Sequence, residues 1–367
     1  STPEASKSLL PRLGLFVTTT IVIGSVIGSG IFKKPAVMAQ AVGSPEIIIL
    51  IWIVAGVLTM FGALTNAEIA SMYPKTGGQY VFFTKMYGDF VGFLYGWSIF
   101  TVIQTGSIAS ITYIFAEYTQ YFIELPRFAH DIEKGFRVAL PYIGNIYPLE
   151  NIGVKALTIS AILFHSGVNY FGIVFGGRFA AFFTSLKIVL ISAIIGCGFA
   201  FGTGSFDNFT TDIAGFSLSN PMLVGGIIAA FSAAFWAYDG WNNITYIAGE
   251  VIRPQKNIPR GLIIGTLVII TVYVLINLAY TYVLPIDEMA ASSLVAADVA
   301  KRSIGAMGGA FIAAAVMIST FGTSNGTIMV SSRVFFAMAE DGLFFRTIGR
   351  VQPRFRTPAN ALLLQAA

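Results

Sequence analysis

Long runs of uncharged, apolar residues recur along the chain and are separated by short polar segments. Eight runs last about 20 residues or more, the length of helix that crosses a bilayer. They are Leu13–Phe32, Ile47–Ala67, Phe90–Ala116, Ala156–Gly177, Phe179–Phe206, Phe216–Tyr238, Gly261–Ile286 and Ser303–Ser332, with Lys187 the single charge inside them. A ninth run begins near Pro358, and we expect the chain to be truncated within this ninth helix. Because lipid admits only helices and closed barrels, the pattern predicts an all-α polytopic membrane protein.

Composition supports embedding in lipid, since 55% of the residues are hydrophobic and only 11% are charged. Soluble domains carry about 25% charged residues. The net charge of +4 does not indicate a nucleic-acid-binding surface. Cys197 is the only cysteine, which excludes an intramolecular disulfide, and we expect no disulfide-linked ancillary subunit. No catalytic, metal-binding or cofactor motif is present, so we expect neither an enzyme nor a cofactor.

The distribution of Lys and Arg predicts the orientation of the chain. With the N-terminus inside, the inside connections hold about twelve of these residues and the outside connections about six. Residues 1–12 are then a short cytoplasmic segment that lacks the pattern of a cleavable signal. The longest connection, Tyr121–Asn151, faces outside. We therefore expect a multi-pass protein of the cell membrane.

The first run contains three glycines and two serines between Gly24 and Gly30. Each glycine weakens a helix by roughly 1 kcal/mol relative to alanine. One interpretation is close packing of a neighbouring helix on Gly24 and Gly28, which have the small-x-x-x-small spacing. The other is an unwound segment around Gly28-Ser29-Gly30, whose free N–H groups bind an anion in the middle of the membrane.

The sixth run continues beyond an Asp239-Gly240 pair to Gly249, so we expect two half-helices. Asp-Gly is a strong helix breaker, and an acidic residue within a membrane span is a candidate for function. Asp239 either caps the second half-helix or contacts a substrate or cation directly. Both roles require a break at this position.

The two breaks lie about 210 residues apart, in the first and sixth runs. This spacing is expected of two five-helix repeats, each opened by a discontinuous helix. Because five is odd, the repeats have opposite orientations in the membrane. Interrupted helices at matching positions of inverted repeats indicate the binding site of a secondary transporter. We expect repeats at residues 13–206 and 216–367, the second being incomplete.

Further motifs accompany the two breaks in a fixed order. They are Gly28-Ser29-Gly30-Ile31-Phe32 with Pro35, Tyr73-Pro74-x-x-Gly77-Gly78, Phe235-x-Ala237-Tyr238-x-Gly240-Trp241-Asn242, Glu250 with Pro254, Lys256, Ile258 and Pro259, Phe321-Gly322-x-x-Asn325-Gly326, and Ser331-Ser332-Arg333. With these motifs the sequence resembles the amino acid–polyamine–organocation (APC) superfamily. It is most similar there to bacterial-type members of the L-type amino acid transporter (LAT) family. The resemblance implies the five-plus-five inverted-repeat (LeuT-like) fold and covers nearly the whole chain.

The resemblance also implies where an amino acid would bind. Its carboxylate would lie on the first break, here Gly28, Ser29, Gly30 and Ile31, where N–H groups and a hydroxyl can donate. Its ammonium group would meet carbonyl groups freed by both breaks. By position these carbonyl groups belong to Val26, Trp236 and Asp239. Ala237, between the last two, is also expected to line the site.

Five other side chains each have two interpretations. Trp236 lies where the family has an aromatic lid over the substrate, with ordinary helix packing as the alternative. Gln104, Thr105, Ser107 and Asn242 either line the cavity or form hydrogen bonds between helices.

Lys187 is a costly residue in the fifth run, because a charge at mid-membrane costs at least roughly 2.5–3.5 kcal/mol. In sodium-independent relatives a lysine here takes the place of a bound sodium ion. The resemblance therefore implies a sodium-site substitute that braces Gly24–Gly28 against residues such as Ser319 or Thr323. Proton coupling through Lys187 is the alternative.

Taken together, the sequence predicts a sodium-independent transporter of neutral L-amino acids that works by alternating access, as an exchanger. Its partners would be the amino acid and the lipid bilayer, with no nucleic acid. A sodium- or proton-coupled symporter of the same fold is the first alternative. A channel or a non-transporting amino acid receptor is an alternative from another class.

Overall fold

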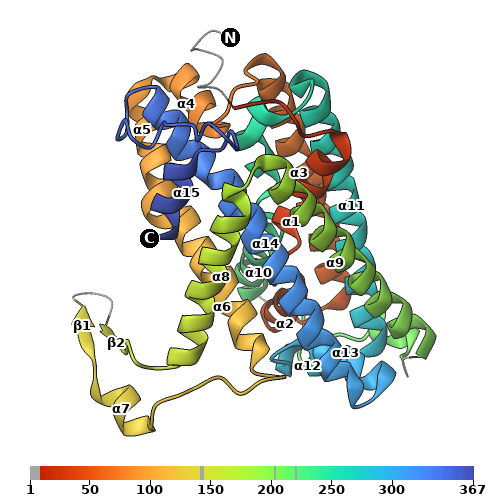
Figure 1. Ribbon diagram of the computed structural model, residues 1–367. Coiled ribbons are helices and arrows are strands. Elements are labelled where there is room, and N and C mark those ends of the chain that lie inside the picture. Colours follow the sequence, from red (N-terminus) through yellow and green to blue (C-terminus); the bar gives the residue numbers. More distant parts are fainter. Residues whose placement is uncertain (1–8, 141–143, 202–203, 220) are drawn as a thin grey trace.

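The computed structural model describes residues 9–140, 144–201, 204–219 and 221–367, which form a bundle of long helices (Figure 1). Within these residues seven helical stretches are long and apolar enough to cross a membrane, and the bent pair α1–α2 is an eighth when taken as one span. The seven are α3 (Pro45–Met72), α5–α6 (Asp89–Thr119), α8 (Ile152–Tyr170), α9 (Ile173–Phe201), α10–η4 (Met222–Glu250), α11 (Pro254–Val283) and α14 (Met307–Glu340). The eight predicted spans are thus present, and α15 (Ala359–Ala366) begins the ninth.

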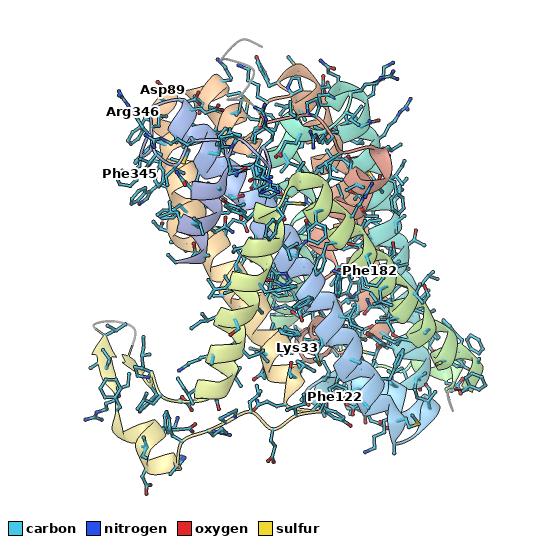
Figure 2. The ribbon with its side chains drawn as sticks, in the orientation of Figure 1. Lys33, Asp89, Phe122, Phe182, Phe345 and Arg346 are labelled. Atoms are coloured by element: carbon cyan, nitrogen blue, oxygen red, sulfur yellow. The ribbon has the colours of Figure 1, made fainter. Side chains whose placement is uncertain are left out.

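The outer face of the bundle is apolar, as contact with lipid requires. Phe182 on α9 is 62% exposed (Figure 2). Asp89 and Arg346 lie together at one end of the bundle, and the described part of the chain begins at the same end in Figure 1. We call this the N-terminal end. Phe122 lies toward the opposite end, which we call the far end.

The first predicted break is confirmed. Helix α1 (Leu15–Val26) and helix α2 (Gly30–Val42) meet at 40°, and Ile27 to Ser29 lie between them. The first span was predicted to end at Phe32, but α2 continues to Val42. Lys33 and Lys34 do not end it, because charged residues can lie on a helix near the membrane surface.

The second predicted break is also confirmed, at Asp239-Gly240 between α10 (Met222–Tyr238) and η4 (Trp241–Glu250). Gly240 has a φ of 105°, and a Cβ there would lie 2.8 Å from the Ser25 carbonyl oxygen. Glycine is therefore required by both conformation and space. The second half is a 3-10 helix, which Gly240 precedes without any side-chain cap. The capping role expected of Asp239 is therefore wrong.

The predicted boundary between the fourth and fifth spans is wrong. It was placed at Arg178, where the charge-free runs meet, whereas α8 ends at Tyr170 and α9 begins at Ile173. Gly172 turns the chain with a φ of 128°. Arg178 lies on an exposed face of α9 and does not interrupt the helix. Lys187 is consequently 14 residues inside α9, roughly 21 Å along its axis.

Shorter elements lie between the spans. The segment η2 (Ile99–Ile103) is a π-helical turn that joins α5 (Asp89–Ser98) to α6 (Gln104–Thr119), and α4 (Gln79–Tyr87), α7 (His130–Gly135), η3 (Phe206–Phe209), α12 (Ile286–Ala291) and α13 (Val295–Ile304) are short helices. The predicted outside connection also contains a hairpin of β1 (Val138–Leu140) and β2 (Gly144–Ile146), in which Val138 pairs with Ile146. This hairpin was not predicted, and every candidate membrane span is helical.

Helices from the two predicted repeats pack against each other throughout the bundle. Helix α11 packs on α1 and α3, helix α14 on α6 and α9, and α10 on α2. Trp52 of α3 has T-shaped ring contacts with Tyr238 and Tyr273 behind the breaks, at centroid distances of 5.7 and 5.4 Å. Both breaks therefore lie in the centre of the bundle. The exact division into two repeats stays a prediction.

Candidate substrate site between two broken helices

A cavity of about 320 Å³ lies between the two breaks. The first break contributes Val26, Gly28, Ser29 and Gly30, and the second contributes Trp236, Ala237 and Asp239. These seven residues were predicted from the sequence, and the fold places them around one space. Polar backbone groups from two unwound segments thus meet in the interior of the bundle.

The first break supplies free hydrogen-bond donors to this cavity. The N–H of Ile27 still bonds to the Ile23 carbonyl, but no backbone acceptor among the described residues pairs with the N–H of Gly28 or Ser29. Gly30 begins α2, and the first N–H groups of a helix lack acceptors within it. The positive end of the helix dipole points at the same place. An anionic group fits here.

Trp236 covers the first break from the side of α10. A Cβ on Gly30 would lie 3.1 Å from Trp236 Cζ3 and 3.1 Å from Ala237 Cβ, so the two broken helices almost touch. The indole ring is 57% exposed, and Lys34 Nζ lies 4.3 Å from its centroid. Lys33, the neighbouring cation, lies in the same part of the bundle (Figure 2). The ring therefore forms a wall between the cavity and the basic residues of α2.

Tyr273 of α11 connects the two breaks from behind. Its hydroxyl lies 2.9 Å from the Ala237 carbonyl oxygen and 3.2 Å from that of Val26, and it donates to these acceptors. The side chain is completely buried. Sequence reasoning missed this residue, because a tyrosine in an apolar span has no local signal that distinguishes it from packing.

Lys187 of α9 reaches the carbonyl end of the first break. Its ammonium group donates to the carbonyl oxygens of Ile27 at 2.7 Å and Gly24 at 3.2 Å, and to Thr323 Oγ1 at 2.8 Å. It is 1% exposed. These are the groups against which the sequence predicted a brace. Helices α1, α9 and α14 meet at this one cation.

Helix α14 adds two hydroxyl groups to the same place. Ser319 Oγ donates to the Ile27 carbonyl at 3.1 Å, and Thr323 Oγ1 lies 3.0 Å from the Gly24 carbonyl oxygen. Two carbonyl oxygens and the Thr323 hydroxyl thus surround the Lys187 ammonium group, and the Ser319 hydroxyl bonds to one of these carbonyls. An oxygen cluster of this kind suits a hard cation such as sodium, and here the lysine occupies it.

Gly24 and Gly28 separate the two interpretations of the glycine-rich run. A Cβ on Gly24 would collide with Thr184 Oγ1 of α9, so this glycine is a packing residue. A Cβ on Gly28 would have no neighbour closer than 4.0 Å, and Gly28 lines the cavity. Close packing and an open break therefore occur in the same run, one helical turn apart.

The remaining sequence candidates divide into two groups. Gln104 and Ser107 line the cavity, whereas Ile31, Thr105 and Asn242 do not. The Ile31 side chain is fully buried elsewhere. Asn242 donates to Gln79 Oε1 at 2.6 Å and so points toward α4.

The π-helical turn η2 explains the position of Thr105. An extra residue in this turn rotates the following helix relative to a regular α-helix. Thr105 Oγ1 bonds to the Phe100 carbonyl, five residues back, and is exposed. No feature of the sequence at residues 99–103 indicates this shift.

Ser25 lines the cavity but was not among the predicted site residues. Its buried hydroxyl has no hydrogen-bond partner among the described residues. A buried hydroxyl without a partner costs roughly 1–3 kcal/mol. Such a group beside unpaired N–H donors is suited to a polar ligand.

A polar cluster separates the cavity from the N-terminal end. Tyr95 of α5 donates to Gln79 Oε1 at 2.5 Å, and its hydroxyl lies 2.7 Å from that of Tyr246 on η4. Asn242 donates to the same Gln79 oxygen. We call Gln79, Tyr95, Asn242 and Tyr246 the gate cluster, since it joins α4 and α5 to the second broken helix.

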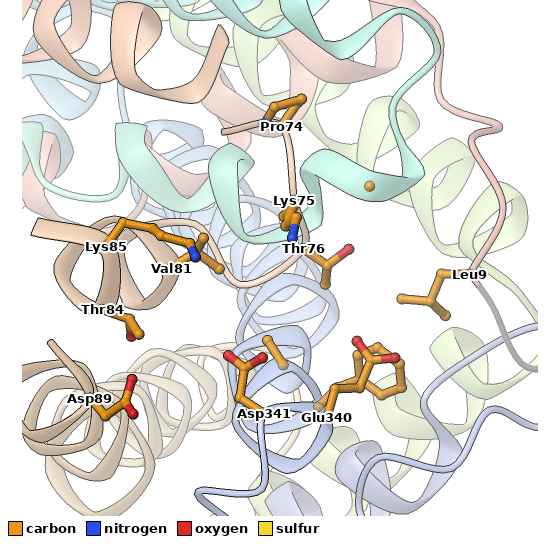
Figure 3. A pocket seen from close by; sticks show the side chains of 13 residues that line it. Leu9, Pro74, Lys75, Thr76, Val81, Thr84, Lys85, Asp89, Glu340 and Asp341 are labelled. Carbon is orange, nitrogen blue, oxygen red and sulfur yellow. The ribbon is translucent and has the colours of Figure 1, made fainter. Parts of the chain in front are cut away.

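A second, larger cavity of about 610 Å³ lies beyond the gate cluster (Figure 3). It is lined by α4 and η4, which also supply gate residues, and by the end of α14. Lys75 and Lys85 lie on one side, and Glu340 and Asp341 on the other. Mixed charges and distance from the breaks make it a vestibule rather than the ligand site.

A buried ion pair holds η4 to α14 near this vestibule. Arg333 donates to Glu250 through Nε at 2.8 Å and through Nη2 at 3.2 Å, and both side chains are fully buried. The Glu250 carbonyl also accepts from the N–H groups of Arg12 and Leu13, at 2.8 and 2.9 Å. The start of the first broken span and the end of the second are thus tied together at the N-terminal end of the bundle.

Comparison with known proteins agrees with this geometry. A family model described as amino acid permease matches residues 13–367. The b(0,+)-type amino acid transporter 1 of Homo sapiens is 32% identical over 98% of this chain and 69% of its own length. The serine/threonine exchanger SteT of Bacillus subtilis is 31% identical over 98% of this chain and 76% of its own. The large neutral amino acids transporter small subunit 2 of Mus musculus is 30% identical over 99% and 66%, respectively.

Proposed function

The chain belongs to the amino acid permease family of the APC superfamily, and we propose that it is a sodium-independent exchanger of neutral L-amino acids. The observation that carries this proposal is the pair of broken helices around one cavity, with Lys187 among the oxygens behind it. One relative, SteT of Bacillus subtilis, is a serine/threonine exchanger, which supports exchange as the mode of transport.

The substrate's backbone groups fit the two breaks. We propose that its carboxylate accepts hydrogen bonds from the N–H groups of Gly28, Ser29 and Gly30. Its ammonium group would donate to carbonyl oxygens of Val26, Trp236 and Asp239. Charge-assisted hydrogen bonds of this kind are about twice as strong as neutral ones. Every amino acid carries a carboxylate and an ammonium group, so this half of the site recognises amino acids as a class.

The side-chain half of the cavity determines which amino acids bind. Trp236, Ala237 and Ser107 offer an apolar wall with one hydroxyl, which suits small neutral side chains. Asp239 is the one ionisable side chain among the described lining residues. Cationic amino acids are therefore a second candidate class, because their side chains could pair with this carboxylate. If free lysine competes with the transported substrate, and this competition is lost in Asp239→Asn, the substrates are cationic amino acids.

Transport without sodium follows from the position of Lys187. Its ammonium group takes the place among three oxygens that a sodium ion would otherwise occupy. Uptake should then be unchanged when sodium is replaced by choline. A requirement for sodium would select the symporter alternative, and uptake driven by a pH gradient alone would select proton coupling.

Alternating access needs a barrier on each side of the cavity that can open. We propose that the gate cluster is the barrier on the N-terminal side and that this end faces the cytoplasm. The excess of Lys and Arg in the connections at this end supports the orientation. Labelling of single cysteines introduced at Lys85 and Lys134 in intact cells tests it, because only the second should react with an impermeant reagent.

Cys197 lies within α9 and is half-buried. Because it is not in a connection, we propose that no ancillary subunit is attached through a disulfide. Electrophoresis without reducing agent tests this, since a covalent partner would appear as a larger band that Cys197→Ser removes.

Counterflow in proteoliposomes tests the proposed function directly. Vesicles loaded with unlabelled serine should accumulate labelled serine transiently, and a panel of external amino acids should compete according to side chain. Saturable counterflow that depends on internal substrate supports exchange. Continuous, unsaturable flux would indicate a channel instead, and binding without counterflow would indicate a receptor.

A further inference from the structure

A basic pocket of about 240 Å³ lies at the N-terminal end of the bundle, apart from the substrate cavity. Four arginines line it together with aromatic side chains, and no acidic residue is among the described residues of its wall. The arginines are Arg12, Arg178, Arg354 and Arg356. They come from the residues before α1, from the first turns of α9 and from the connection after α14. The transport mechanism uses none of them.

The pocket is held together by contacts that do not involve its cations. Thr357 Oγ1 donates to the Tyr170 carbonyl at the end of α8, at 3.0 Å. The Phe355 ring contacts those of Phe171 and Tyr170, at centroid distances of 5.4 and 6.0 Å. The connection after α14 is thereby fixed on the α8–α9 turn. These contacts hold the connection that carries Arg354 and Arg356 in place, and they do not require contacts between the arginines.

Three of the pocket's four arginines have no carboxylate partner in the part of the chain that the structure describes. Arg12, Arg178 and Arg354 form no ion pair with any carboxylate of the described residues. Three like charges facing one space repel each other, so the pocket favours an anion. Arginine is especially suited to phosphate, because its planar group donates two parallel hydrogen bonds.

The surroundings of the pocket are apolar and face lipid. Phe171 and Phe175 are 58% and 53% exposed and border the arginines. Phe175, Phe182 and Val189 are spaced by seven residues on α9 and so lie on one face, with Arg178 between the first two. Phe182 and Val189 are 62% and 63% exposed (Figure 2). A row of exposed apolar side chains on α9 therefore extends from the basic pocket.

We propose that this pocket binds the phosphate headgroup of an anionic phospholipid, with its acyl chains lying along the Phe182–Val189 face of α9. Basic pockets between membrane helices on the cytoplasmic side are suited to such headgroups. The apolar row distinguishes a lipid from a free phosphate, which would use the arginines alone. The proposal is independent of the transported substrate.

The test compares two double variants of the full-length protein that lose the same charge. Arg178→Gln with Arg354→Gln removes half of the pocket's arginines. Arg346→Gln with Arg350→Gln removes two exposed arginines of the same connection that do not line the pocket. Each protein is reconstituted in phosphatidylcholine with and without phosphatidylglycerol, and bound lipid is measured by native mass spectrometry.

Each arginine near an anionic membrane surface contributes about a fivefold gain in affinity, so the pocket variant should bind phosphatidylglycerol roughly 30-fold more weakly. The control variant should bind it like the unmodified protein. Phe182→Ser should also weaken lipid binding, because it interrupts the apolar row. Equal binding by both double variants would overturn the proposal. So would displacement of the lipid by inorganic phosphate at similar concentration, which would assign the pocket to a soluble anion.

Discussion

Replacement of Lys187 by alanine tests how the first break is held in place. The ammonium group makes three buried hydrogen bonds to α1 and α14. A hydrogen bond to a charged group contributes about 1.5–3 kcal/mol, so the three together contribute roughly 4.5–9 kcal/mol. The cost of the buried charge offsets about 2.5–3.5 kcal/mol of this. The net coupling of α9 to the break is therefore between about 1 and 6.5 kcal/mol.

Even the lower limit shifts a conformational equilibrium about fivefold, since 1.4 kcal/mol corresponds to a factor of ten. Counterflow by Lys187→Ala should fall at least fivefold while the protein remains folded. Lys187→Met should fall similarly, because it keeps most of the side-chain volume but donates no hydrogen bond. This pair separates the loss of the brace from the opening of a void.

Ser185→Ala is the matched control on the same helix. Among the described residues its hydroxyl bonds only to the Ala181 carbonyl of α9, at 2.9 Å, so transport should be normal. Elution on size exclusion and the melting temperature show whether each variant is folded. Undiminished counterflow in a folded Lys187→Ala protein would refute the reasoning, because the carbonyl groups of the break would then need no cation.

Three further predictions concern single contacts. Gly30→Leu should abolish counterflow, because even a Cβ at this position would lie 3.2 Å from the Ala237 backbone. Gly225→Leu on α10 is the control and should retain counterflow, because a Cβ there would have no neighbour within 4 Å. Equal activity of the two variants would contradict the close approach of the two broken helices. Tyr273→Phe should lower transport about 5- to 140-fold through the loss of roughly 1–3 kcal/mol. Activity within twofold of the unmodified protein would show that its hydroxyl is not needed. The hydrogen bond from the Arg127 guanidinium lowers the pKa of Glu133. The Arg127–Glu133 pair therefore stabilises the outside connection fully above the ordinary glutamate pKa, and this stabilisation is lost as the pH falls through the lowered pKa of Glu133. The protection factor of the Asn151 amide, which donates to Glu133, should therefore decrease in acid, and Glu133→Gln should remove this pH dependence.

The sequence predicted the two breaks because their cause is local. Glycine and serine around Gly28 and the Asp239-Gly240 pair weaken a helix wherever it lies. The position of Lys187 against the first break was also predicted, because a charge in the membrane requires polar partners and the family resemblance indicated which ones. The eight spans follow from length and charge alone.

What the sequence could not predict depends on geometry between helices. The turn at Gly172 contains no charge, so the span boundary was placed instead at Arg178. The π-helical turn η2 rotates Thr105 out of the cavity. Tyr273 is one of 15 tyrosines, and only the crossing of α11 behind both breaks distinguishes it.

The contacts at the N-terminal end bear on why this carrier would exchange substrates. Lys187 holds the end of helix α1 through the Gly24 and Ile27 carbonyls, and the Glu250 carbonyl holds its start. The Glu250 side chain is paired with Arg333 of α14. Movement of α1 alone breaks the first two connections, and movement together with η4 breaks the ion pair. Separation of a buried pair costs about 3–5 kcal/mol. An exchanger requires this kind of barrier, because an empty carrier that reorients freely allows net flux. A bound substrate lowers this barrier to reorientation only if it binds the two breaks more tightly while the helices move than before they move.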